Sequence, residues 1–131
     1  MANAETERLA IEHVMQLERA AGREPEDVSR RGAPYDISSP PRKIEVKAFG
    51  GSARGAVVPL EERQVTEARR DPENFYVYVV DNVTTANGTD IAVRRLHGDL
   101  LNAMITRTRP HITYWPTLRV EDYDRLGGQD P

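Results

Sequence analysis

The sequence predicts an α/β fold in which a mixed central β-sheet is flanked by helices. Three observations favour this fold class: helical spacing of apolar residues near the N-terminus, alternating apolar and charged residues at 43–49, and an unbroken aromatic and β-branched run at 75–80. The chain has 131 residues, 38% of them hydrophobic and 30% charged, which suits one compact domain. We therefore expect a single domain over residues 1–131 that ends in a disordered tail at 126–131.

The N-terminal part is predicted to be a helix followed by a loop. The helix spans Glu5 to Ala21, and Gly22 ends it because glycine accepts the backbone conformation of a helix C-terminus. The polar segment 23–32 contains a proline and a glycine and has the composition of a loop. The apolar face of the helix is formed by Ala10, Ile11, Val14, Leu17 and Ala21.

The next part is predicted to contain three strands, at 35–38, 43–49 and 56–60. Pro40 and Pro41 suit a tight turn, so the first two strands are expected to form a hairpin. The third strand follows a glycine-rich loop and contains a proline, which ends it or places it at an edge of the sheet.

The second half is predicted to continue with a helix at 61–70 and a strand at 75–80. The apolar run of this strand is typical of a strand buried on both faces, so we expect it at the middle of the sheet. A turn at Asn87-Gly88, a strand at 91–96 and a short helix at 98–104 complete the order.

Composition excludes several classes of protein. The chain has no cysteine, so disulfides, thiolate metal sites and a cysteine nucleophile are ruled out. Neither a signal peptide nor a run of ~18 apolar residues is present, and we expect a cytoplasmic protein with no membrane partner. The net charge of -3 implies that any nucleic-acid surface is a local patch.

The candidate chemistry lies in the predicted hairpin. Side chains alternate along a strand, so Glu45 and Lys47 share one face and the apolar residues between them point to the other. The hairpin can bring Asp36 beside Glu45, and two such carboxylates repel each other unless a divalent cation lies between them. We therefore expect a Mg²⁺ or Mn²⁺ site at Asp36 and Glu45. The simpler interpretation is a structural Glu–Lys pair on an exposed strand.

Lys47 completes this candidate hydrolytic site. A metal ion held by two carboxylates keeps open positions for water and for a phosphate oxygen. From one pleat repeat beyond Glu45, Lys47 can orient or deprotonate a water and offset charge developing on phosphorus.

These residues carry a resemblance to a known family. Asp36 followed by Glu45-x-Lys47, between two predicted helices, resembles the PD-(D/E)XK nuclease superfamily, although Pro34-Tyr35-Asp36 lacks its Pro-Asp dipeptide. More narrowly, the sequence resembles the C-terminal domain of the plant protein NO VEIN over roughly residues 7–83. The motifs that carry the narrower resemblance are Glu18-Arg19-x-x-Gly22-Arg23-x-Pro25, Asp36-Ile37-Ser38, Ile44-Glu45-Val46-Lys47 and Tyr76-Val77-Tyr78-Val79-Val80.

The resemblance also implies further site residues. Many superfamily members complete the metal site with a glutamate of the first helix, and Glu7 and Glu18 both fall on its apolar stripe. Glu7 has the better family-like spacing, and Glu18 is the alternative; Glu12 lies nearly opposite. Gln64 resembles a polar residue that some members place beside the site.

The resemblance implies a Mg²⁺-dependent endonuclease acting on DNA in restriction, defence or repair. Related bacterial domains occur alone or attached to helicases and restriction-type proteins, so a helicase or restriction partner and a homodimer are expectations as well. The alternative is a non-catalytic module that keeps the fold and recognises nucleic acid or protein.

Other polar and aromatic residues receive structural roles. His13, His97 and His111 lack metal-ligand spacing. We interpret the arginine pairs at 69–70, 94–95 and 107–109 as solvated, with phosphate contact as the alternative, and Trp115 as a core residue.

Overall fold

The computed structural model describes residues 3–83, 90–128 and 130. The predicted turn at Asn87-Gly88 lies outside the described residues. No helix in the described part has the length and apolar character that crossing a membrane requires. Along the chain the elements are α1 (Ala4–Ala20), β1 (Glu26–Asp27), β2 (Ile37–Ser39), β3 (Arg42–Ala48), α2 (Glu62–Arg70), β4 (Phe75–Asp81), β5 (Ala92–His97), α3 (Gly98–Thr106) and α4 (Val120–Leu126).

The predicted α/β class and mixed sheet are confirmed. The sheet has five strands in the order β1-β2-β3-β4-β5. Strands β3 and β4 are parallel and are connected through α2, whereas every other neighbouring pair is antiparallel. The parallel pair needs this helical crossover because a short turn cannot return the chain to the same end of the sheet.

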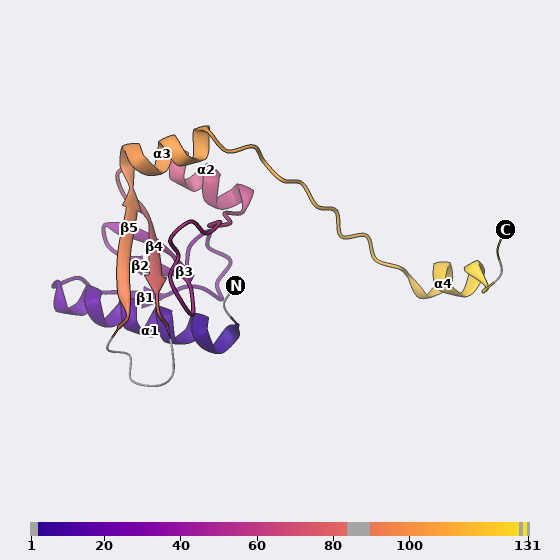
Figure 1. Cartoon of the computed structure of the whole chain (residues 1–131), viewed down its shortest axis with the longest axis horizontal. Coiled ribbons are helices and arrows are strands. Elements are labelled where there is room, and N and C mark those ends of the chain that lie inside the picture. The colour runs from indigo at the N-terminus through magenta and orange to yellow at the C-terminus, as the bar shows by residue number, and fades with distance from the viewer. Residues whose placement is uncertain (1–2, 84–89, 129, 131) are drawn as a thin grey trace.

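Helices cover the two faces of the sheet separately (Figure 1). Helix α1 packs against Ile44, Val46, Tyr78 and Val80, which form one buried core. Helices α2 and α3 cover the other face, where a second core contains Ala68, Phe75, Val77, Val79 and Leu101. We call these two sides the α1 face and the α2 face. The alternation of side chains along β3 and β4 sorts their residues between the two cores.

The start and end of α1 follow from its terminal residues. Asn3 caps the helix, since its side chain accepts a hydrogen bond of 2.9 Å from the Thr6 backbone. Gly22 has a φ of +84°, and its N–H and that of Arg23 bond back to carbonyls of the last turn. The predicted glycine stop is therefore confirmed.

Three predictions of the fold are wrong. Residues 56–60 form no strand and lie outside the five-stranded sheet. Strand β4 is the fourth of five, so β3 occupies the middle; β4 is nonetheless paired on both sides, which explains its apolar run. The predicted loop 23–32 includes the short strand β1, formed by two exposed residues without a strand pattern.

The C-terminal segment departs most from expectation. Residues 107–119 run away from the domain in an extended form and lead to α4 (Figure 1). Trp115, interpreted as a core residue, is 87% exposed. Helix α4 lies where the sequence analysis predicted no element, and it shares only Leu126 with the predicted disordered tail.

Candidate active site

Strand β3 places Glu45 and Lys47 together on the α2 face. Glu45 lies opposite Val77 of β4 and Lys47 lies opposite Val79, and both valines belong to the core beneath α2 and α3. The predicted shared face is therefore confirmed. The ammonium of Lys47 is 3.2 Å from Oε2 of Glu45.

Asp36 is held beside this pair by the end of strand β2. Its backbone N–H donates to the Ile44 carbonyl at 2.9 Å, which extends the β2–β3 ladder by one residue. Its carboxylate accepts a hydrogen bond of 2.9 Å from the Val46 N–H. A side chain thus satisfies a strand donor beyond the end of β2, and this contact fixes Asp36 next to β3.

The two carboxyl groups interact strongly. Burial raises the pKa of Glu45 to about 7, with repulsion from Asp36 as the second cause and Lys47 acting in the opposite direction. Burial also raises the pKa of Asp36, and the hydrogen bond from Val46 opposes the rise. The pair therefore tends to retain one proton near neutral pH.

Glu45 also has one oxygen without a partner. Its side chain is buried, and its Oε1 atom has no hydrogen-bond partner among the described residues. A buried carboxylate oxygen that is unsatisfied costs free energy unless a proton or a cation meets it. The donor set of two carboxylates suits a hard divalent cation such as Mg²⁺, which commonly takes one or two carboxylates and completes its shell with water or phosphate oxygen.

The first helix contributes no carboxylate to this pair. Glu7 is exposed on α1, and α1 covers the α1 face of the sheet, whereas Asp36 and Glu45 share the α2 face. Across the described residues, no three histidine, aspartate or glutamate side chains converge as metal ligands. The expectation that Glu7 completes the site is therefore not met by this geometry, because the apolar stripe of α1 faces the other core.

Glu18 is fully buried on the α1 face and has different partners. Ser39 and Tyr78 donate to its two oxygens at 2.9 and 3.0 Å, and the guanidinium of Arg23 pairs with it. Burial alone would raise the pKa of Glu18, but the hydrogen bonds from Arg23, Ser39 and Tyr78 lower it below its usual value. Glu18 therefore belongs to a buried network that joins α1 to the sheet. The sequence signal was a carboxylate on an apolar stripe, which the structure explains without a metal.

Gln64 has a role in starting helix α2. Its Oε1 accepts from the Glu61 N–H at 2.9 Å, and Glu61 reciprocates by accepting from the backbone of Gln64. This capping box satisfies donors at the helix N-terminus and accounts for the burial of Gln64. Helix α2 lies on the same face of the sheet as Glu45. A role for Gln64 beside the candidate site stays a prediction.

Sequence reasoning missed two ion-pair clusters on the α2 face. Lys43, on the same face of β3, pairs with Glu67 at 2.6 Å and with Asp71 at 3.0 Å. Asp81 at the end of β4 is buried and pairs with Arg94 at 2.8 Å. The position of Lys43 two residues before Glu45 could have indicated that its side chain lies on the same face of β3. The other partners are distant in sequence and gave no such signal.

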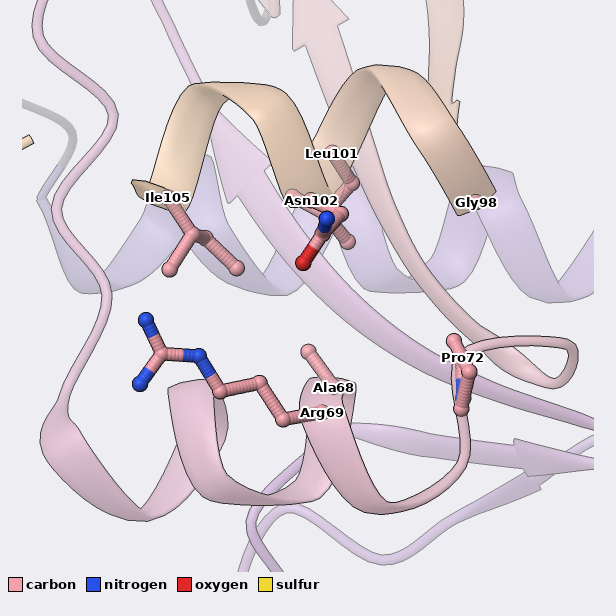
Figure 2. A pocket seen from close by; sticks show the side chains of 7 residues that line it. All are labelled: Ala68, Arg69, Pro72, Gly98, Leu101, Asn102 and Ile105. Carbon is pink, nitrogen blue, oxygen red and sulfur yellow. The ribbon is translucent and has the colours of Figure 1, made fainter. Parts of the chain in front are cut away.

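A small pocket lies between α2 and α3 (Figure 2). The side chains of Ala68, Leu101 and Ile105 line it, and Arg69 lies along one wall. The lining is mostly apolar and includes none of the predicted site residues. We therefore assign the candidate chemistry to the Asp36–Glu45–Lys47 cluster.

Comparison with known proteins identifies the family. Residues 6–94 match the family described as protein NO VEIN, C-terminal. Neither the curated proteins nor the solved structures contain a match to the chain. The matched range runs from α1 into β5 and includes Asp36, Glu45 and Lys47, and it covers more than half of the chain. The chain therefore belongs to the family of NO VEIN C-terminal domains.

Proposed function

We propose that this domain is a metal-dependent nuclease of the PD-(D/E)XK superfamily that hydrolyses phosphodiester bonds of DNA. The observation that carries the proposal is the pair of half-buried Asp36 and buried Glu45: Oε1 of Glu45 has no partner among the described residues, and its Oε2 lies 3.2 Å from the Lys47 ammonium. Structural ion pairs seldom leave such an oxygen unsatisfied. Such an activity would serve in restriction, defence or repair. The domain would act alone or with a helicase-like partner.

Asp36 and Glu45 are the residues that would hold Mg²⁺ or Mn²⁺. A bound divalent cation supplies Lewis-acid polarisation of a phosphate oxygen and lowers the pKa of a bound water. The contact from Val46 keeps the Asp36 carboxylate oriented, which limits the reorganisation needed when a ligand arrives.

Lys47 holds a positive charge beside the carboxylate pair. Its ammonium already contacts Glu45, so it is positioned before a substrate binds. An ammonium at this place can stabilise negative charge that develops on the phosphate oxygens, and it can orient a water for attack. Its contribution therefore belongs to the transition state more than to substrate binding.

The test is metal binding measured by calorimetry, followed by a cleavage assay on single- and double-stranded DNA. We expect wild type to bind Mg²⁺ or Mn²⁺ and Asp36→Asn to lose both binding and cleavage. Asp99→Asn, which removes an exposed carboxylate of α3, is the matched control and should behave as wild type. Equal metal affinity in wild type and Asp36→Asn would overturn the assignment.

A second candidate function is a recognition module that keeps the nuclease fold without cleavage. One observation favours it: among the described residues, no third histidine, aspartate or glutamate side chain joins Asp36 and Glu45 as a metal ligand. Absence of cleavage by pure wild-type protein on DNA and RNA, together with retained nucleic-acid binding, would favour this module.

A further inference from the structure

The segment 107–119, which we call the arm, has a composition unlike that of the whole chain. It contains three arginines and one histidine and no acidic residue, whereas the net charge of the chain is -3. Its two large aromatic residues lie between His111 and Arg119. Tyr114 and Trp115 are adjacent and are 84% and 87% exposed.

The arm is free to accept a ligand along its length. It extends from the end of α3 into solvent (Figure 1). Prolines at 110 and 116 favour extended backbone, and a segment of this length spans roughly 40 Å when extended. Among the described residues, neither Arg107 nor Arg109 pairs with a carboxylate, while Arg119 pairs with Asp122 at the start of α4.

The arm starts on the side of the sheet that carries the candidate site. It follows α3, which packs with α2 over the face that holds Glu45 and Lys47. A long polymer held by the arm can therefore continue toward this face without crossing the sheet. The domain itself offers little basic surface near the site, because Lys43 and Lys47 are both paired with carboxylates.

We infer that the arm binds the backbone and bases of a single nucleic-acid strand. Arginine side chains neutralise phosphates, and exposed aromatic rings provide faces on which bases stack irrespective of sequence. A second copy of this chain is less well matched. Outside the arm and α4, Val57 and Leu100 are the large apolar side chains exposed in the described domain, so a second copy offers little apolar surface to receive the arm.

This inference rests on the proposed function for its choice of ligand, and its test is independent of catalysis. The binding of fluorescein-labelled single-stranded DNA of about 20 nucleotides is measured by anisotropy in EDTA, over a range of salt concentrations. Trp115 is the only tryptophan in the chain, so its fluorescence reports contact with the arm directly. We expect the oligonucleotide to quench this fluorescence.

Two double variants test the two kinds of contact. Arg107→Gln/Arg109→Gln should weaken binding about tenfold or more and reduce the slope of log affinity against log salt by about 1 to 2. Tyr114→Ala/Trp115→Ala should also weaken binding at least about tenfold and leave the slope nearly unchanged. Arg8→Gln/Arg19→Gln removes the same charge from exposed positions of α1 and should leave both quantities near wild type.

Several outcomes would overturn the inference. Equal affinity of the arm variants and wild type, or no quenching of Trp115, would exclude the arm as the nucleic-acid contact. A change from dimer to monomer in the arm variants, seen by analytical ultracentrifugation and without a change in DNA affinity, would assign the arm to a second copy. Retained arm-dependent binding without any cleavage would refute the proposed nuclease and leave this inference standing.

Discussion

Glu45 is a buried carboxylate whose ion pair with Lys47 only partly offsets the effects of burial and of repulsion from Asp36. Its pKa of about 7 compares with 4.5 for a free glutamate. Below about pH 4.5 the Glu45 carboxyl group is protonated in both the folded and the unfolded state. Folding then buries a neutral acid, and no free energy is spent on burying a charge. As the pH rises through 7, the folded state acquires the buried charge, so the stability present at low pH is lost.

The expected result is that Glu45→Gln stabilises the protein at about pH 8 by about 1 to 3 kcal/mol when metal is absent. The amide is neutral at every pH, so the advantage should vanish near pH 4.5. The measurement is chemical denaturation in EDTA at several pH values. Glu12→Gln, at an exposed position of α1, is the control and should show no such pH dependence.

Lys47 is expected to act on the rate of cleavage. Under the proposed nuclease function, Lys47→Ala should lower kcat by about 100-fold or more and change DNA affinity in Ca²⁺ only slightly, because its charge would act when charge develops on phosphorus. Lys43→Ala is the matched control, because Lys43 lies on the same face of β3 but pairs with Glu67 and Asp71. Similar rates for wild type and Lys47→Ala would remove Lys47 from the mechanism.

The three residues of the candidate site were predictable because they lie within one hairpin. Period-two alternation placed Glu45 and Lys47 on one face, and the short connection brought Asp36 beside them. The face of the sheet on which the glutamates of α1 lie was not predictable. Periodicity shows which residues of α1 face a core, but it does not show which side of the sheet that core occupies.

At the scale of elements, α1 is attached to the sheet by apolar contacts and by one buried polar network. Glu18 accepts from Arg23, Ser39 and Tyr78, which come from the segment after α1, from β2 and from β4. Each of these hydrogen bonds satisfies a carboxylate oxygen of Glu18 that is buried from water. The network therefore stabilises the position of α1 only as long as all members are present.

We expect Glu18→Ala to lower the free energy of unfolding by about 3 to 5 kcal/mol, because it leaves Arg23 and two hydroxyl groups without their acceptor. Thermal and urea denaturation measure this loss. Glu12→Ala changes the same residue type on the exposed side of the same helix and should alter stability by less than about 0.5 kcal/mol. A small effect of Glu18→Ala would mean that the network contributes little.

Elements with a strong internal pattern were predictable, and elements that depend on partners were not. Helix α1 and strands β3 and β4 were predicted within a residue or two of their bounds. Residues 56–60 contain two valines, but a strand also needs a neighbouring strand to pair with, and no local pattern shows whether one is in reach. Strand β1 forms because β2 offers such a neighbour, despite its two exposed acidic residues.

At the scale of the whole molecule, the domain and the arm are expected to be energetically separate. Trp115, Tyr114 and the apolar residues of α4 are exposed, so they add little burial to the folded domain. A chain that ends at Arg107 should keep its thermal midpoint within about 2 °C of the full chain. Circular dichroism measures this midpoint, and a marked decrease would show that the arm packs on the domain in solution.

Side-chain alternation in β3 has a consequence for how this family can change over generations. A single codon inserted or deleted between Ile44 and Lys47 would move the side chain of Glu45 or Lys47 to the α1 face, into the apolar core. It would also place an apolar side chain on the α2 face. A substitution there changes one side chain, whereas a change of length moves the following side chains to the opposite face. Genes descended from a common ancestor should therefore vary in length within the loops 28–34 and 50–61 and keep the four codons of 44–47 uninterrupted.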